Sequence, residues 1–265
     1  MLNKIIKKIF HILVVMLVWL SIWELICFFN LTSKSLIPFP HKILSNMMSL
    51  EFINRYIVVM LPNTFLWVII AWSLGILTAI LFAIASIAST SISRLLQVVF
   101  ISGRTLPSVI AIPLFAAIMG FGRPTTFICT IFLVLCYSEP SIQESLRTIN
   151  TTRKAFLEVV PLSRFNSLIL IILPGISKTL KAISTQSFGI ALVVTIAGEM
   201  ILALPDSIGN EVAQMAWLLK MVDLYSLISW LRLSSLITMQ ITEYLPRFFE
   251  LPANYTIHKI NDKIL

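Results

Sequence analysis

Long apolar runs separated by short polar turns dominate this chain. Six windows of about 20 mostly apolar residues lie near 9–29, 64–87, 95–119, 124–144, 179–202 and 224–246. A helix needs about 20 such residues to cross the hydrocarbon core of a bilayer. The pattern therefore predicts an all-α integral membrane protein with about six transmembrane helices.

The third window is the least regular of the six. Pro107 and Pro113 interrupt it, and the turn FGRP at 121–124 is all that separates it from the fourth window. Membrane helices tolerate proline where neighbouring groups satisfy the freed carbonyls, so we expect one kinked spanning helix. A re-entrant hairpin is the alternative.

The longest polar interval, about residues 145–178, lies between the fourth and fifth windows. It shows helical periodicity in two short pieces, with Pro161 at the break and Leu173-Pro174-Gly175 closing the second. This pattern predicts two short amphipathic helices along the membrane surface, where a partner could dock. The chain then divides into a first helix with its outer loop (1–62), a membrane core (63–250) and a tail (251–265).

Composition supports the membrane assignment. Of 265 residues, 58% are apolar and 12% are charged, whereas an ordinary soluble domain carries about 25% charged residues. The chain has 20 Lys and Arg against 12 Asp and Glu. No dense basic block is interleaved with aromatics, so nucleic-acid binding is not expected.

The basic residues also predict an orientation. With the N-terminus inside, thirteen of them fall on cytoplasmic segments and five on the opposite side. Cytoplasmic loops of membrane proteins carry an excess of Lys and Arg. Both termini are therefore expected in the cytoplasm.

Catalytic and metal-binding motifs are not apparent in the sequence. It contains neither a Walker-type loop, nor a G-x-S-x-G elbow, nor an H-E-x-x-H helix, and its three histidines have no ligand spacing. The three cysteines, Cys27, Cys129 and Cys136, lie in apolar runs and are expected to be small buried hydrophobes. We expect no cofactor, no metal and no enzymatic activity.

Ionisable residues at membrane depth are functional candidates by default. Glu24, Arg232 and Glu243 lie near helix ends, where the side chain can reach the interface. Arg104, just before the Pro107 kink, and Glu199 are harder to explain in that way. They either face a water-filled path or its gate, or pair structurally inside the bundle.

Several short segments follow one another in a recognisable order. They are Trp23-Glu24-Leu25, Leu36-Ile37-Pro38-Phe39-Pro40, Arg104-Thr105-Leu106-Pro107, Ala111-Ile112-Pro113-Leu114, Phe121-Gly122, Ala197-Gly198-Glu199-Met200 and Ser207-Ile208-Gly209. In this order the chain resembles the permease subunits of binding-protein-dependent ABC importers. The branch is that for nitrate, sulfonate, taurine and pyrimidine precursors, and the resemblance spans nearly the whole chain.

The resemblance also implies a cytoplasmic loop that docks into an ATPase subunit. The family's Glu-Ala-Ala and Gly fall at Ala155-Phe156-Leu157 and at Pro161, which are departures. Pro161 can preserve the break between two helices, and Glu158 either replaces the lost carboxylate or is a solvated charge. The implied coupling residues are Ala155, Glu158, Pro161, Leu162, Ser163, Arg164, Phe165, Leu173, Pro174 and Gly175.

The resemblance further implies a homodimer of six-helix subunits in the bacterial inner membrane. Its partners would be a cytoplasmic ATP-binding subunit and an extracytoplasmic solute-binding protein. It would import a small nutrient of the sulfonate, taurine, nitrate or pyrimidine-precursor type. Arg104, Pro107 and Glu199 remain the candidate path or gate residues, because of the charges at membrane depth and the proline kink. An autonomous channel or secondary carrier is the alternative, although carriers often show two related halves and none are visible here. A membrane-embedded enzyme comes third.

Overall fold

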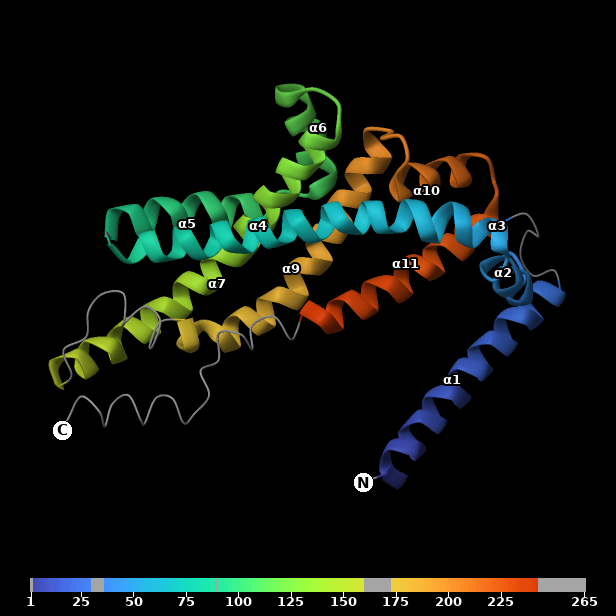
Figure 1. Cartoon of the computed structure of the whole chain (residues 1–265), viewed down its shortest axis with the longest axis horizontal. Coiled ribbons are helices and arrows are strands. Elements are labelled where there is room, and N and C mark those ends of the chain that lie inside the picture. Colours follow the sequence, from blue (N-terminus) through green and yellow to red (C-terminus); the bar gives the residue numbers. More distant parts are fainter. Residues whose placement is uncertain (1, 30–35, 89, 160–172, 243–265) are drawn as a thin grey trace.

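Figure 1 shows the computed structural model of the chain, which describes residues 2–29, 36–88, 90–159 and 173–242. Within these ranges the regular structure is entirely helical, which confirms the all-α class. The helices are α1 (Leu2–Phe28), α2 (Pro40–Met47), α3 (Leu50–Phe52), η1 (Ile53–Met60), α4 (Leu61–Ala88), α5 (Thr90–Arg104), α6 (Ser108–Met119), α7 (Arg123–Val159), α9 (Leu173–Ile201), α10 (Ile208–Trp217) and α11 (Met221–Thr242).

Three helical segments of the described chain are long and apolar enough to cross a membrane. They are Leu50–Ser86, which joins α3, η1 and α4, then Arg123–Ile149 in α7 and Pro174–Ile201 in α9. They coincide with the second, fourth and fifth predicted windows. The first and sixth windows are helical as α1 and α11, and their crossing of the membrane stays a prediction.

The third window differs from its prediction. Instead of one kinked helix, α5 ends at Arg104, α6 begins at Ser108, and their axes differ by 109°. Pro107 has an extended backbone at the start of α6. It has no amide hydrogen and disfavours helix at the preceding residue, so the chain breaks here rather than bending. The pair is a broken span or a re-entrant loop, which allows at most four candidate spans in the described chain.

The interval after the fourth window also needs a correction. The first of the two short pieces predicted there is helical, but it is the end of α7, which continues without interruption to Val159, and not a separate helix. Residues 160–172, which include most of the second piece, lie outside the described residues. Residues 173–178 form the beginning of α9.

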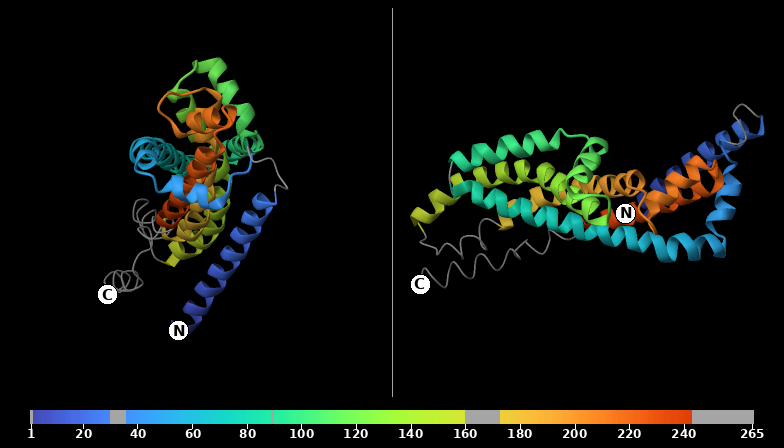
Figure 2. Two further views of the ribbon diagram at one scale, coloured as in Figure 1. Left: turned by 90° about the vertical axis from the view of Figure 1, so that its right-hand side faces the viewer. Right: turned by 90° about the horizontal axis from the view of Figure 1, so that it is seen from above.

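The helix α7 lies at the centre of the bundle, packed against α4, α5 and α9 (Figures 1 and 2). Small residues allow this close approach. A Cβ atom added at Gly75 would lie 2.5 Å from a side-chain carbon of Val134, and one at Gly103 would lie 2.5 Å from the Cys136 sulfur. Such small-residue contacts are typical of helix packing in membranes.

The helix α1 runs away from the bundle and joins it at the end where α2 lies (Figure 1). There His41 Nδ1 of α2 lies 2.7 Å from a Glu24 carboxylate oxygen. The Cys27 thiol, buried as expected, donates to the carbonyls of Ile37 and Pro38. These contacts hold the end of α1 against the proline-rich segment that follows it.

Candidate functional site

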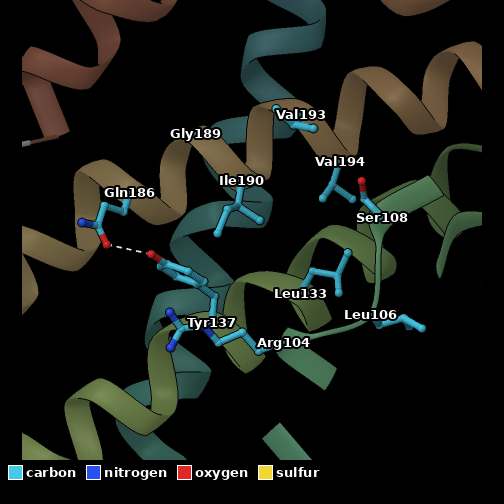
Figure 3. A pocket seen from close by; sticks show the side chains of 10 residues that line it. All are labelled: Arg104, Leu106, Ser108, Leu133, Tyr137, Gln186, Gly189, Ile190, Val193 and Val194. Atoms are coloured by element: carbon cyan, nitrogen blue, oxygen red, sulfur yellow. Dashed lines mark hydrogen bonds between the residues drawn. The ribbon is translucent and has the colours of Figure 1, made fainter. Parts of the chain in front are cut away.

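A cavity of about 540 Å³ lies between the α5–α6 break, α7 and α9 (Figure 3). Its walls combine polar side chains with apolar ones. The lining residues are Arg104, Leu106, Ser108, Leu133, Tyr137, Gln186, Gly189, Ile190, Val193 and Val194. Arg104, Leu106 and Ser108, on either side of the 109° turn between α5 and α6, form one wall of this space.

The cavity lies at the middle of the apolar segments. Tyr137 is next to the centre of the candidate span Arg123–Ile149, and Gly189 is near the centre of Pro174–Ile201. If both segments cross a bilayer, the cavity is at mid-depth, far from either headgroup region. Polar groups at that depth require a partner or water.

Arg104 supplies the positive charge of the cavity. Its guanidinium carbon lies 4.6 Å from the centre of the Tyr137 ring, a cation–π contact. Among the ion pairs of the described residues, none involves Arg104, and its side chain is exposed. The charge is therefore held by an aromatic face, and no described acidic side chain forms an ion pair with it.

Tyr137 and Gln186 form the second polar element. The Tyr137 hydroxyl donates to Gln186 Oε1 at 2.7 Å, which links α7 to α9 across the cavity (Figure 3). This bond holds the tyrosine ring beneath the guanidinium of Arg104. Gly189 lies one helical turn further along α9, and a Cβ added there would meet nothing within 4 Å. The α9 wall is consequently open at Gly189.

Glu199 occupies a different and closed environment near the end of α9. Its side chain is 2% exposed. Thr64 Oγ1 of α4 lies 3.0 and 3.2 Å from its two carboxylate oxygens, and the Gly209 amide donates to Oε2 at 3.0 Å. Because Gly209 is in the first turn of α10, the carboxylate also stabilises the positive end of that helix dipole. We call Thr64, Glu199 and Gly209 the clamp.

Close packing surrounds the clamp. A Cβ at Gly209 would lie 2.4 Å from the backbone oxygen of Ile196, and one at Gly198 would lie 2.4 Å from a methyl carbon of Thr126. The neighbouring Arg123 donates to the carbonyls of Pro205 and Asp206 at 3.0 and 3.1 Å. Only about 10 Å³ of space remains beside Glu199. Two segments that look unrelated in the sequence, 197–200 and 207–209, are thus one packed unit.

The structure separates the predicted path residues. Arg104 lines the cavity and Pro107 begins the next helix beside it, whereas Glu199 belongs to the clamp, and no salt bridge joins Arg104 to Glu199. Among the other charges at depth, Glu24 contacts His41 and Arg232 is exposed on α11. Glu243 lies outside the described residues.

The predicted coupling residues are only partly described. Ala155 and Glu158 fall in the last turns of α7, and Leu173, Pro174 and Gly175 form the first turn of α9. A Cβ at Gly175 would lie 2.6 Å from the end of Ile149, so α9 begins against α7. The remaining candidates lie outside the described residues; they are Pro161, Leu162, Ser163, Arg164 and Phe165.

Sequence reasoning missed Glu139, which is fully buried in α7. Gln143 Nε2 donates to its Oε1 at 3.3 Å, while Oε2 has no hydrogen-bond partner among the described residues. The buried hydroxyl of its neighbour Ser138 also has no hydrogen-bond partner among the described residues. A carboxylate inside the fourth window was a visible signal. Tyr137 and Gln186 carried none, because their role depends on the contact between α7 and α9.

Comparison with known protein families finds no family model that matches the chain, and comparison with curated proteins finds no matching sequence. The resemblance to ABC importer permeases is therefore a ground for a proposal and does not establish membership.

Proposed function

We propose that this chain is the membrane permease subunit of an ATP-driven importer of a small nutrient. The cavity carries the proposal, because it lies at the centre of two candidate spans and contains Arg104, whose charge has no ion-pair partner among the described residues. A charge held at membrane depth without a partner is costly and marks a path or a ligand site. The α5–α6 break supports a path, since irregular backbone at depth is tolerated where it lines a cavity.

The ordered short motifs support the ATP-driven class over other transporters. In the resembling permeases such a chain pairs with a second copy, a cytoplasmic ATP-binding subunit and an extracytoplasmic solute-binding protein. We propose the same partners here, in a bacterial inner membrane with six crossings and both termini in the cytoplasm. The nutrient would be of the sulfonate, taurine, nitrate or pyrimidine-precursor type.

The length of α7 is consistent with a coupling role for the segment that follows it. The helix runs without interruption through 37 residues from Arg123 to Val159. At 1.5 Å per residue it is about 55 Å long, whereas the hydrocarbon core of a bilayer is about 30 Å thick. We propose that the C-terminal end of α7 projects beyond the bilayer on the cytoplasmic side, where the ATPase subunit would dock.

The energy source of uptake tests the proposed class. Vesicles from cells that produce the whole transport system should accumulate its nutrient when ATP is supplied on the cytoplasmic side. Accumulation should survive ionophores that collapse ion gradients. Uptake that persists without ATP and stops with ionophores would instead identify a secondary carrier, and passive uptake would identify a channel.

Substitution of the coupling segment tests the docking claim. The double variant Arg164→Ala and Phe165→Ala should reduce the ATPase activity that co-purifies with the chain from detergent extracts, because an Arg beside an aromatic suits a desolvated anchor. Lys178→Ala, an exposed basic residue of α9, is the matched control. Full co-purification and full transport in the double variant would exclude docking through these residues.

A further inference from the structure

We infer that the cavity binds a small organic monoanion with an apolar body, whose oxyanion headgroup is held by Arg104. The inference deepens the proposed function and rests on it for the claim that this anion is the transported solute. The binding itself follows from the geometry of the cavity and can be tested separately.

The contact between Arg104 and Tyr137 explains why the ligand is an anion. An arginine over an aromatic ring is attracted by the ring face, but its N–H donors lie in the guanidinium plane and stay available. No described acidic side chain forms a salt bridge with this residue. Carboxylates and related oxyanions match the guanidinium fork with paired, charge-assisted hydrogen bonds.

The remaining walls explain why the anion is organic. Leu106 and Leu133 line the side of the cavity formed by the α5–α6 connection and α7, and Ile190, Val193 and Val194 line the α9 side. A bare inorganic ion would leave these apolar walls without a partner. At about 540 Å³ the cavity also falls within the range of small-molecule sites, which are mostly apolar with a few placed polar groups.

The charge balance of the lining argues against a zwitterion. An ammonium group would need a carboxylate, and no Asp or Glu is among the lining residues. The only anionic alternative of the same chemistry is a lipid headgroup. Its normal position is the membrane interface, whereas the cavity lies at the centre of the candidate spans. A solute in transit therefore fits the position better.

The open space at Gly189 provides a direct test. A Gly189→Cys thiol would project into the cavity, so its alkylation by N-ethylmaleimide reports access to that space. The full chain in zwitterionic nanodiscs would be treated with this reagent, with the unaltered chain as blank because its described cysteines are buried. Ala182→Cys, exposed on α9 outside the lining, is the matched control, and Val193→Cys is the second reporter if Gly189→Cys does not fold.

Four probes of similar chemistry separate the features of the ligand. Hexanoate should slow alkylation at position 189 and not at position 182. Hexanamide, which lacks the charge, 6-aminohexanoate, which is a zwitterion, and nitrate, which lacks the apolar body, should protect weakly or not at all. Adding Arg104→Gln should weaken hexanoate binding by about tenfold or more, because a charge-assisted hydrogen bond is lost.

Several results would overturn the inference. Equal protection by hexanamide, or protection that survives Arg104→Gln, would show that the cavity does not recognise the negative charge of the ligand. Failure of position 189 and position 193 to react at all would show that the cavity is closed in a bilayer. Protection produced by phosphatidylglycerol nanodiscs without hexanoate, and unchanged by hexanoate, would assign the guanidinium to a lipid headgroup.

These outcomes are independent of the ATP requirement. Hexanoate protection together with ATP-independent uptake would keep the anion site and defeat the proposed importer. ATP-driven uptake without hexanoate protection would keep the importer and defeat the anion site.

Discussion

The cavity and the clamp use charged residues in opposite ways. Both Arg104 and Glu199 are charges within apolar runs of the sequence. Glu199 is 2% exposed and receives hydrogen bonds from Thr64 and Gly209, whereas Arg104 is exposed, lies over a tyrosine ring and has no described acidic partner. A satisfied charge ties helices together, and an unsatisfied charge beside open space is available to a ligand.

Two glycines show the same difference in the backbone. A Cβ at Gly209 in the clamp would collide with the backbone oxygen of Ile196, while a Cβ at Gly189 in the cavity would meet nothing within 4 Å. The clamp is therefore built for close approach, and the cavity has room for another molecule. Substitutions in the clamp are therefore expected to lower stability, and substitutions in the cavity are expected to lower uptake.

The largest effect is expected at Gly209. Gly209→Ala places a methyl group 2.4 Å from a backbone oxygen that cannot rotate away. Overpacking of this kind costs about 1–3 kcal/mol or more, so the thermal midpoint in detergent and the membrane abundance should both fall. Gly189→Ala is the matched control and should leave both unchanged or slightly raised, since alanine favours helix over glycine. Equal midpoints for the two variants would mean that the clamp is looser than described.

Glu199→Gln should have the next largest effect. The amide keeps the shape but loses the charge, and it can present an N–H to the Gly209 amide that now donates to Oε2. Leaving a buried donor unsatisfied costs about 1–3 kcal/mol. We expect lower membrane abundance with a normal uptake rate per folded molecule. Normal abundance with impaired uptake would instead move Glu199 from the clamp to the gate.

Arg104→Gln should show the reverse pattern. Its side chain is exposed and makes no ion pair in the described chain, so abundance and thermal midpoint should change little. Uptake of the system's nutrient in vesicles should fall about tenfold or more, since one charge-assisted contact is removed. Arg232→Gln, an exposed arginine of α11 outside the cavity, is the control and should retain uptake. Reduced abundance with normal uptake per molecule would make Arg104 a structural residue.

The smallest effect is expected for Glu139→Gln. The amide oxygen can still accept the bond from Gln143, and Oε2 has no described partner to lose. A neutral group of the same shape in that buried position should change the thermal midpoint little or raise it. Uptake should also be normal. Loss of uptake at unchanged abundance would show that a second charge, outside the cavity, is needed for transport. Function would then not be confined to the cavity.

The charged residues of the cavity and the clamp could be predicted from the sequence, but their neighbours could not. Arg104 and Glu199 were visible as rare charges in apolar windows, and Glu139 was equally visible but overlooked. Tyr137, Gln186 and Gly189 were not predictable, because they meet only where α7 and α9 pack together. Thr64 was hidden for the same reason, since it lies 135 residues from the carboxylate it contacts.

The sequence by itself determined the helical class, the apolar segments and the positions of their charges. These are local properties, since hydrophobic run length and proline chemistry act over one or two helical turns. Tertiary structure alone decided that α5 and α6 turn by 109°, that α7 extends to Val159, and that the clamp is closed while the cavity is open. Such features depend on which helices approach one another, because a charge is satisfied or left free by groups that are distant along the chain.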